Sequence, residues 1–289
     1  MCGILLAGGS GTRLSPTTRA VNKHLLPIYD KPMIFYPLTT LILADVRDIC
    51  IVSTTNGIQQ FNQLMGDGTQ WGLRLTYVVQ DQPRGIADGI KIALESFVNK
   101  EPVLVALGDN VFHGQGLGRN ISEFAYASKC VIWTQEVNNP ESFGIATLDA
   151  EGKIFSIIEK PEDEVGNLAI TGLYYFPDSV YDIVQDLRIS TRGEFEITEI
   201  LNRYLNSGNL IHEKLSRGVY WLDAGTIENL FDASQFVHTV QTRQGNLIGS
   251  PEEAALRMNR INESDFKKIV SSMPNSSYRN FLLDIKLID

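Results

Sequence analysis

The sequence predicts an α/β fold, in which a central, mixed but mostly parallel sheet carries helices on both faces. Short apolar runs alternate with amphipathic stretches through the first half of the 289 residues, and this alternation is typical of a covered parallel sheet. The hydrophobic content is 43% and the charged content 20%, which suits a globular chain with a sizeable core. A hairpin pattern in the second half makes the predicted sheet mixed.

The first half is expected to alternate strictly between buried strands and helices. The strands are expected at residues 3–7, 48–53, 73–79, 103–107 and 130–134. The helices are expected at residues 33–46, 58–65, 85–98 and 118–128. Because ligands of such sheets bind at the carboxyl ends of the strands, the residues that follow each strand are the first candidates for chemistry.

The second half is expected to add a hairpin, single strands and more helices. The hairpin joins strands at 143–148 and 153–159 through a glycine-containing turn at 149–152, a common signal for antiparallel pairing. Further strands are expected at 170–176, 210–215 and 219–222, and helices at 179–187, 196–206 and 226–241. Segments near 251–253, 264–273 and 276–285 predict a small helical appendage.

No linker, internal repeat or low-complexity segment divides the chain. We therefore predict one α/β domain over residues 1–245, with insertions for ligand binding and oligomerisation, and a helical C-terminal tail over 246–289 packed on that domain. The tail contains Phe281, Leu282 and Leu283, which either pack on their own domain or are covered by another subunit.

Charge and composition exclude several classes of protein. The net charge is −9, which argues against general binding to nucleic acid or anionic lipid. The N-terminus lacks the basic region of a signal peptide, and no apolar run is long enough to span a bilayer. The three cysteines, Cys2, Cys50 and Cys130, have no metal-ligand spacing, and we expect them to be buried thiols in a reducing cytoplasm.

The strongest local signal is a glycine-rich loop that directly follows the first strand. It runs from Gly8 to Leu14 with the sequence GGSGTRL. Glycines allow backbone N–H groups to approach an anion, and a helix N-terminus after the loop would add positive partial charge. The loop lacks the Gly-Lys-Ser/Thr ending of a Walker loop and the third glycine of the dinucleotide fingerprint. Arg13 within it favours a polyphosphate over simple packing.

Three charged residues have positions that suit phosphate chemistry. Lys23 follows the glycine loop closely and is a candidate phosphate contact. Asp109 follows the strand at 103–107, and Asp223 follows the short strand at 219–222. Mg²⁺ commonly takes one or two protein carboxylates together with substrate phosphates, so this pair of aspartates is chemically sufficient for a magnesium site.

The motifs occur in the order found in bacterial glucose-1-phosphate thymidylyltransferases, which this chain resembles from Met1 to about residue 285. The motifs are GGSGTRL at 8–14, KHLLPIYDKPM at 23–33, GDN at 108–110, EKP at 159–161, RGEFEIT at 192–198 and WLDAGT at 221–226, with IGSPEE at 248–253 in the tail. The resemblance implies a Rossmann-like nucleotide-diphospho-sugar transferase fold. It also implies transfer of a thymidylyl group from dTTP to glucose 1-phosphate, which gives dTDP-glucose and pyrophosphate.

The resemblance assigns a role to each motif. The nucleotide-binding residues it implies are Gly8, Gly9, Ser10, Gly11, Thr12, Arg13, Gln80, Gly85 and Asp109. The sugar-phosphate pocket it implies comprises Gly144, Glu159, Lys160, Ile170, Tyr174, Arg192 and Glu194. Asp109 and Asp223 correspond to ligands of Mg²⁺, and Arg13, Lys23, Asp109, Lys160 and Asp223 form the expected catalytic set. The expected partners are dTTP, glucose 1-phosphate, further copies in a homotetramer, and a nucleotide or nucleotide-sugar effector.

The base-reading segment departs from the usual pattern of this group. Gln80 could form paired hydrogen bonds with the imide edge shared by thymine and uracil, with the backbone around Gly85 completing the contact. However, Asp81, Gln82, Arg84 and Asp88 differ from the residues usual there, and His24 stands where glutamine is common. A UTP-preferring uridylyltransferase is therefore the alternative enzyme.

Two other classes remain as alternatives to an enzyme of this type. A nucleotide-sugar sensor without turnover would keep the fold, but the complete catalytic set argues against lost activity. A dinucleotide oxidoreductase would need the missing third glycine and an acidic residue soon after the second strand. The four histidines, at 24, 113, 212 and 238, have no metal-ligand spacing.

Overall fold

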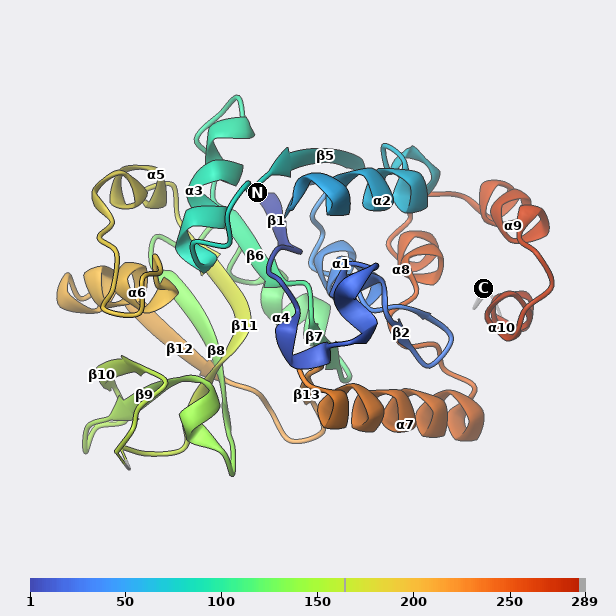
Figure 1. Cartoon of the computed structure of the whole chain (residues 1–289). Coiled ribbons are helices and arrows are strands. Elements are labelled where there is room, and N and C mark those ends of the chain that lie inside the picture. Colours follow the sequence, from blue (N-terminus) through green and yellow to red (C-terminus); the bar gives the residue numbers. More distant parts are fainter. Residues whose placement is uncertain (164, 286–289) are drawn as a thin grey trace.

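The computed structural model describes residues 1–163 and 165–285, and its centre is a nine-stranded sheet (Figure 1). The strands of this sheet are β1 (Cys2–Leu6), β4 (Asp48–Ser53), β5 (Arg74–Val79), β6 (Val103–Leu107), β8 (Cys130–Glu136), β9 (Gly144–Leu148), β10 (Ile154–Glu159), β11 (Leu168–Phe176) and β12 (Leu210–Lys214). Each strand predicted for this sheet is present, with its ends shifted by at most a few residues, because buried apolar runs bounded by glycine and polar turns define strands well.

The sheet is parallel on one side and mixed on the other. Strands β6, β1, β4 and β5 lie side by side and are parallel. Strand β11 pairs antiparallel with β6, and it also pairs antiparallel with β8 and β9. Strand β12 is parallel to β8, and β9 and β10 form the predicted hairpin. The mixed α/β architecture expected from the sequence is therefore confirmed.

Helices cover both faces of this sheet. The α-helices are α1 (Phe35–Leu43), α2 (Thr55–Met65), α3 (Ile86–Ser96), α4 (Leu117–Ser122), α5 (Val180–Ile183), α6 (Ile197–Asn206), α7 (Ile227–Gln244), α8 (Pro251–Arg257), α9 (Glu263–Ser272) and α10 (Ser277–Leu283). Helix α4 is shorter than predicted, since residues after Ser122 continue as turns with hydrogen bonds between residues three apart. Helix α7 is slightly longer than predicted and ends at Gly245, whose φ of 69° suits glycine.

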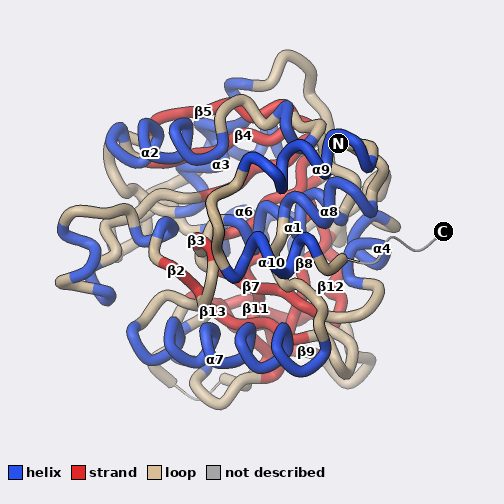
Figure 2. The backbone as a smooth tube through the Cα atoms, turned by 90° about the vertical axis from the view of Figure 1, so that its right-hand side faces the viewer, coloured by secondary structure: helices blue, strands red, loops and turns tan. Residues whose placement is uncertain are grey.

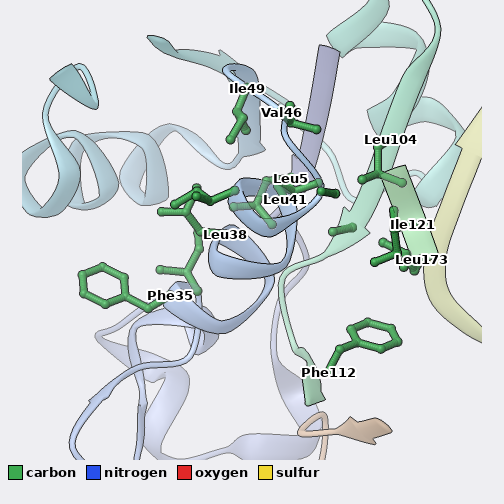
Figure 3. Packing of buried hydrophobic residues seen from close by; sticks show 14 of the residues in the cluster. Leu5, Phe35, Leu38, Leu41, Val46, Ile49, Leu104, Phe112, Ile121 and Leu173 are labelled. Carbon is green, nitrogen blue, oxygen red and sulfur yellow. The ribbon is translucent and has the colours of Figure 1, made fainter. Parts of the chain in front are cut away.

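Alternate residues of the central strands enter two separate cores. Leu5 and Ile49 point to the core that contains α1, α2 and α4, whereas Ile4 and Cys50 point to the core that contains α3 and α6. Figure 3 shows the first core, where Leu38 and Leu41 of α1 pack near Leu5. The period of two in strand side chains thus explains why these runs are apolar throughout.

Two small sheets were not predicted as pairs. Strand β7 (Asn110–His113) pairs antiparallel with β13 (Tyr220–Asp223), and β2 (Pro27–Ile28) pairs with β3 (Lys31–Pro32). The sequence predicted β13 but not β7, which is short and follows β6 after a two-residue turn. The β7–β13 pair joins segments that are far apart in the sequence, and it builds one side of the site described below.

The C-terminal helices α8, α9 and α10 follow α7 in the chain and lie close together (Figure 2). Helix α8 packs on α1, and Leu256, Phe266, Val270 and Leu282 form a small core of their own. Leu282 is buried there, whereas Leu283 is 55% exposed. The division into residues 1–245 and 246–289 stays a prediction.

All three cysteines lie in the core that contains α3 and α6. Cys2, Cys50 and Cys130 are all buried and free, as expected from the sequence. Burial raises the pKa of the Cys50 and Cys130 thiols, which makes their reactive thiolate forms scarce. Within residues 1–163 and 165–285, no helix combines the length and apolar character that crossing a membrane requires.

Candidate active site

A cavity lies at the carboxyl ends of the central strands. Its volume is about 340 Å³, within the range of small-molecule sites. Of the residues predicted for the site, the following line it: Gly8, Gly9, Arg13, Lys23, Gln80, Gly85, Asp109, Gly144, Glu159, Lys160, Ile170, Tyr174, Glu194 and Asp223. The structure therefore brings together nearly all residues chosen from separate motifs, and their individual roles stay predictions.

Four predicted residues lie outside the cavity lining: Ser10, Gly11, Thr12 and Arg192. Gly11 has φ of 60° and precedes a three-residue 3₁₀ helix (Thr12–Leu14), which stands where the sequence suggested a helix N-terminus. Arg192 lies near the cavity, since its Nη1 is 3.8 Å from Glu159 Oε1 and 3.7 Å from Glu196 Oε1. These residues stay predicted contacts for parts of a ligand that extend beyond the cavity.

The glycine loop is held open by bonds to its surroundings. The Ala7 N–H donates to the Val52 carbonyl at 2.8 Å, and the Gly108 N–H donates to the Leu6 carbonyl at 2.8 Å. The Thr18 hydroxyl donates to the Gly11 carbonyl at 2.8 Å. Gly9 has φ of 95°, and a Cβ added there would meet no atom within 4 Å. The loop is thus anchored at its base and at Gly11, and at Gly9 it faces free space, as anion binding requires.

Asp109 and Asp223 come close because β7 and β13 pair. Asn110 of β7 is the register partner of Asp223, and the Ala224 N–H donates to the Asp109 carbonyl at 2.9 Å. Lys23 completes the cluster, since its Nζ lies 2.5 Å from Asp109 Oδ2. The structure thus places two carboxylates from distant motifs next to one ammonium group at the cavity wall.

The electrostatics of the two carboxylates differ strongly. Burial would raise the pKa of Asp109, but the Lys23 ammonium beside it holds that pKa well below its usual range. Burial and the negative charge of Asp109 raise the pKa of Asp223 to about 6, against the lowering effects of Lys23 and Arg13. Neutralisation of the cluster is therefore incomplete, and a further cation would be favourable there.

Glu159 and Lys160 end strand β10 at another part of the cavity. Burial and the neighbouring Glu196 raise the pKa of Glu159, although Lys160 and Arg192 oppose this. Lys160 has φ of 40°, a conformation that side chains rarely adopt, and its N–H donates to the Phe143 carbonyl at 3.0 Å. A strained backbone at a cationic residue in a cavity is a common feature of ligand-binding positions.

Sequence reasoning missed several residues that line the cavity. His24 is buried, its Nδ1 lies 2.9 Å from Asn22 Oδ1, and burial lowers its pKa to about 3, so the ring is neutral. Asn110 accepts a hydrogen bond from Trp221 Nε1 and donates to Asp109 Oδ1 at 3.0 Å. The other missed residues of the lining include Pro83, Phe143, Gly172, Thr198 and Trp221. Trp221 and Asn110 lie next to the two aspartates within the matched motifs, so the motifs could have indicated that these two residues belong to the site.

The arrangement fits the joining of two phosphate compounds. Arg13 and Lys23 supply cations near the glycine loop, and Lys160 supplies a cation beside polar and aromatic side chains. Arg13 lies close to Asp223, since a Cβ on Gly225 would be 3.1 Å from Arg13 Nη2 and 2.9 Å from Asp223 Oδ1. Cations at two separate parts of one cavity suit two anionic substrates.

Comparison with known proteins gives a consistent result. The nucleotidyl transferase family matches residues 2–240. A glucose-1-phosphate thymidylyltransferase of Mycolicibacterium smegmatis is 44% identical over 285 residues, which cover 99% of each chain. A protein of the same name from Xanthomonas campestris is 43% identical over 281 residues, covering 97% of this chain and 95% of the relative.

Solved structures agree on the architecture. A putative glucose-1-phosphate thymidylyltransferase from Bacillus anthracis, crystallised with sucrose, aligns with a TM-score of 0.75 and 37% identity. The alignment covers 82% of this chain and 94% of that one. A UDP-glucose pyrophosphorylase in complex with UDP-glucose aligns with a TM-score of 0.72 at 22% identity, covering 83% and 99%, which shows a shared fold only.

Proposed function

Because the chain belongs to the nucleotidyl transferase family, and within it to the glucose-1-phosphate thymidylyltransferases, we propose that the cavity described above joins a thymidylyl group from dTTP to glucose 1-phosphate. The products are dTDP-glucose and pyrophosphate. The observation that carries this proposal is the meeting of Arg13, Lys23, Asp109, Asp223 and Lys160 at one cavity.

The chemistry needs positioning and charge more than proton transfer. A phosphate oxygen of glucose 1-phosphate, already anionic at neutral pH, attacks the α-phosphorus of dTTP. The new O–P bond forms as the bond from the α-phosphorus to the bridging oxygen of the β-phosphate breaks, and the electron pair leaves with pyrophosphate. No general base is required, so cations that hold the two polyanions in line supply most of the catalysis.

The residues beside the glycine loop are assigned to the triphosphate. Arg13 and the backbone of Gly8 and Gly9 line the cavity there, and Lys23 would contact the departing pyrophosphate. The Lys23 ammonium is held in place by Asp109 at 2.5 Å. A preorganised cation next to the leaving group stabilises developing negative charge without reorganisation cost.

We assign a magnesium site to Asp109 and Asp223. Carboxylate oxygens are the ligands that Mg²⁺ prefers, and the raised pKa of Asp223 beside Asp109 indicates negative charge that a cation would relieve. Across the described residues no group of three or more His, Cys, Asp or Glu side chains gathers as a closed metal site, which suits an ion that also takes substrate phosphates and water. When bound, Mg²⁺ neutralises charge on the phosphates.

The sugar phosphate is assigned to the end of β10 and its neighbours. Lys160 is placed to pair with the phosphate. Glu159 has a raised pKa and lies 3.8 Å from Arg192 Nη1 through its Oε1, and it is placed to accept hydrogen bonds from glucose hydroxyls. Gly144, Ile170, Tyr174 and Glu194 line the same region. Gly144 leaves room there, since a Cβ would lie 3.4 Å from Glu159 Oε2.

Substitutions in the two subsites are expected to separate the substrates. Arg13→Ala should mainly weaken use of dTTP, and Lys160→Ala should mainly weaken use of glucose 1-phosphate. Arg13 lies in the loop after β1, which is a central strand, whereas Lys160 follows β10, which is at one edge of the sheet (Figure 1). Each KM is expected to rise by about 10-fold or more for the matching substrate. Initial rates with each substrate varied in turn would show this, and a loss confined to dTTP in both variants would overturn the assignment of Lys160.

Base preference is tested by a panel of nucleotides. Rates of pyrophosphate release with dTTP, dUTP, UTP and CTP should rank dTTP first, with UTP used less efficiently. Comparison of dTTP with dUTP isolates the thymine methyl, for which a difference of about 1–3 kcal/mol is ordinary in a fitted apolar pocket. Equal or better use of CTP would contradict an imide-reading site, because cytosine presents a different hydrogen-bonding edge.

We also propose that the chain works as a homo-oligomer in the cytoplasm, with a tetramer as the expected form. Large apolar side chains remain exposed on the single chain, among them Phe155 at 76%, Phe231 at 61% and Tyr220 at 52%, and burial of such side chains would favour a contact between subunits. Light scattering that shows a monomer at working concentration would contradict the oligomer. An effector nucleotide stays a proposal without assigned residues.

A further inference from the structure

The side-chain amide of Gln80 has its orientation fixed by its neighbours. Gln80 Nε2 donates to Asp88 Oδ2 at 2.8 Å and to the Gly85 carbonyl at 3.2 Å. The Gly85 carbonyl can only accept a hydrogen bond, and the Asp88 carboxylate already accepts one from Arg84 Nη2 at 2.9 Å. Both neighbours therefore require the nitrogen of the amide on their side. The two N–H groups of Gln80 are both used, and only Oε1 remains.

The remaining oxygen lies against the glycine loop. A Cβ on Gly8 would be 3.0 Å from Gln80 Oε1, and a Cβ on Gly89 would be 3.7 Å from the same atom. Gln80 is 7% exposed and lines the cavity with Gly8, Gly85 and Gly89. Gln80 Oε1 is thus held close to two glycines of the cavity lining, Gly8 and Gly89, which have no side chains to cover it.

Asp88 is itself held firmly. It lies in the first turn of α3, is 4% exposed, and pairs with Arg84 one turn earlier. The Arg84 guanidinium lies 5.9 Å from the centre of the Phe195 ring, and the Phe195 N–H donates to the Arg84 carbonyl at 2.7 Å. A buried carboxylate fixed by a charged partner is a strong and directional hydrogen-bond acceptor.

We propose that Asp88 is a positioning residue that sets the base specificity of this site through Gln80. Asp88 and the Gly85 carbonyl hold the amide so that Oε1 alone meets the base, which favours a base that offers a ring N–H at that point. Thymine and uracil offer N3–H, whereas cytosine carries a lone pair at N3. The paired hydrogen bonds expected from the sequence would need Nε2, which is already engaged.

The Gly85 backbone supplies the second contact in this arrangement. Across residues 1–163 and 165–285, the Gly85 N–H is not bonded to any other protein group. Gly85 must be glycine, since its φ is 107° and a Cβ would lie 2.4 Å from the Phe195 carbonyl oxygen. One acceptor from Gln80 and one donor from Gly85 match neighbouring N–H and C=O groups of an imide. This inference rests on the proposed function and adds a residue that controls it.

The test compares Asp88→Asn with Glu95→Gln. Asparagine at 88 can donate as well as accept, so only the Gly85 carbonyl still requires the Gln80 nitrogen, and the amide can turn more readily and present N–H to cytosine N3. We expect the ratio of kcat/KM for dTTP to that for dCTP to fall by about 10-fold or more. Glu95→Gln removes the same charge from an exposed position of α3 and should leave the ratio within about 2-fold. An unchanged ratio in a folded Asp88→Asn variant would overturn the proposal.

Two further measurements keep the outcome clear. Wild-type protein should use N3-methyl-dTTP about 100-fold less well than dTTP, because the methyl group removes the N–H that Oε1 requires. This measurement needs no variant, and equal use would overturn the proposal even if Asp88→Asn fails to fold.

The Gln80→Met variant tests the two residues separately. If it lowers the ratio of kcat/KM for dTTP to that for dCTP and Asp88→Asn does not, Gln80 reads the base but Asp88 does not position it. Absence of any turnover with dTTP would instead contradict the proposed function.

Discussion

Replacing Asp223 with asparagine is expected to lower kcat by about 100-fold or more while it stabilises the ligand-free protein. The loss of rate follows from removing one of two carboxylates assigned to the magnesium site, where charge on the reacting phosphates is neutralised. The substitution should preserve the local structure, since the asparagine amide oxygen can still accept the hydrogen bond that the Gly225 N–H donates to Asp223 Oδ1 at 2.9 Å.

The stabilisation follows from the raised pKa of Asp223. A carboxyl whose pKa rises from 3.8 to about 6 on folding favours the folded state below the unfolded pKa. This contribution is lost as the pH rises through about 6, so the ionised group costs roughly 2–3 kcal/mol at neutral pH. Asparagine removes the cost. In EDTA, the free energy of unfolding of the wild type minus that of the variant should fall between about pH 4 and pH 7.

Chemical unfolding at several pH values and steady-state kinetics together check this pair of effects. Near-normal turnover of Asp223→Asn at an unchanged magnesium requirement would refute the assignment of the site. A variant that loses both activity and stability would show that Asp223 has a structural role, because the account requires the two quantities to move in opposite directions.

Replacing Lys23 with methionine is expected to impair catalysis severely and also to destabilise the fold. Lys23 Nζ lies 2.5 Å from Asp109 Oδ2, and their side chains are only 15% and 11% exposed. Without the ammonium, Asp109 remains as a buried charge with an Asp223 carboxylate nearby. Removal of one partner of a buried ion pair commonly costs about 3–5 kcal/mol, and kcat should fall by about 100-fold or more because the pyrophosphate loses its cation.

The matched control is the double variant Lys23→Met, Asp109→Asn. It removes both charges and should recover much of the stability lost in Lys23→Met, without recovery of activity. The contribution of Asp109 to stability also depends on pH. Because the pKa of Asp109 is held below its usual range, its stabilising effect is present above about pH 4 and is lost only in strong acid. Full activity of Lys23→Met would contradict the role of Lys23 at the leaving group.

The strands of the central sheet could be predicted because burial on both faces requires a continuous run of apolar residues in the sequence. Leu5 and Ile4 point to opposite cores, so the strand must be apolar throughout, and this distinguishes it from the amphipathic helices. The sequence could not predict the β7–β13 pair, since Asn110–His113 is short and its partner lies far along the chain. Long-range pairing of short strands depends on tertiary packing rather than on local pattern.

The candidate site could be predicted in its charged residues and less in its neutral ones. Arg13, Lys23 and Asp109 have distinctive chemistry within their motifs, and all three line the cavity. His24 and Asn110 were missed because their roles depend on burial and on hydrogen bonds that only the folded chain reveals. The orientation of the Gln80 amide is the clearest case, since nothing in the sequence shows that Asp88 uses its nitrogen.

The most direct test of the account is pyrophosphate release by the purified wild-type protein with dTTP, glucose 1-phosphate and Mg²⁺. The account predicts one pyrophosphate for each dTDP-glucose formed, release that depends on both substrates, and no release from the Asp223→Asn variant above about 1% of the wild-type rate. Tight binding of nucleotide without pyrophosphate release would indicate a sensor, and release without glucose 1-phosphate would indicate simple hydrolysis. Either result would contradict transfer between two substrates held in this cavity.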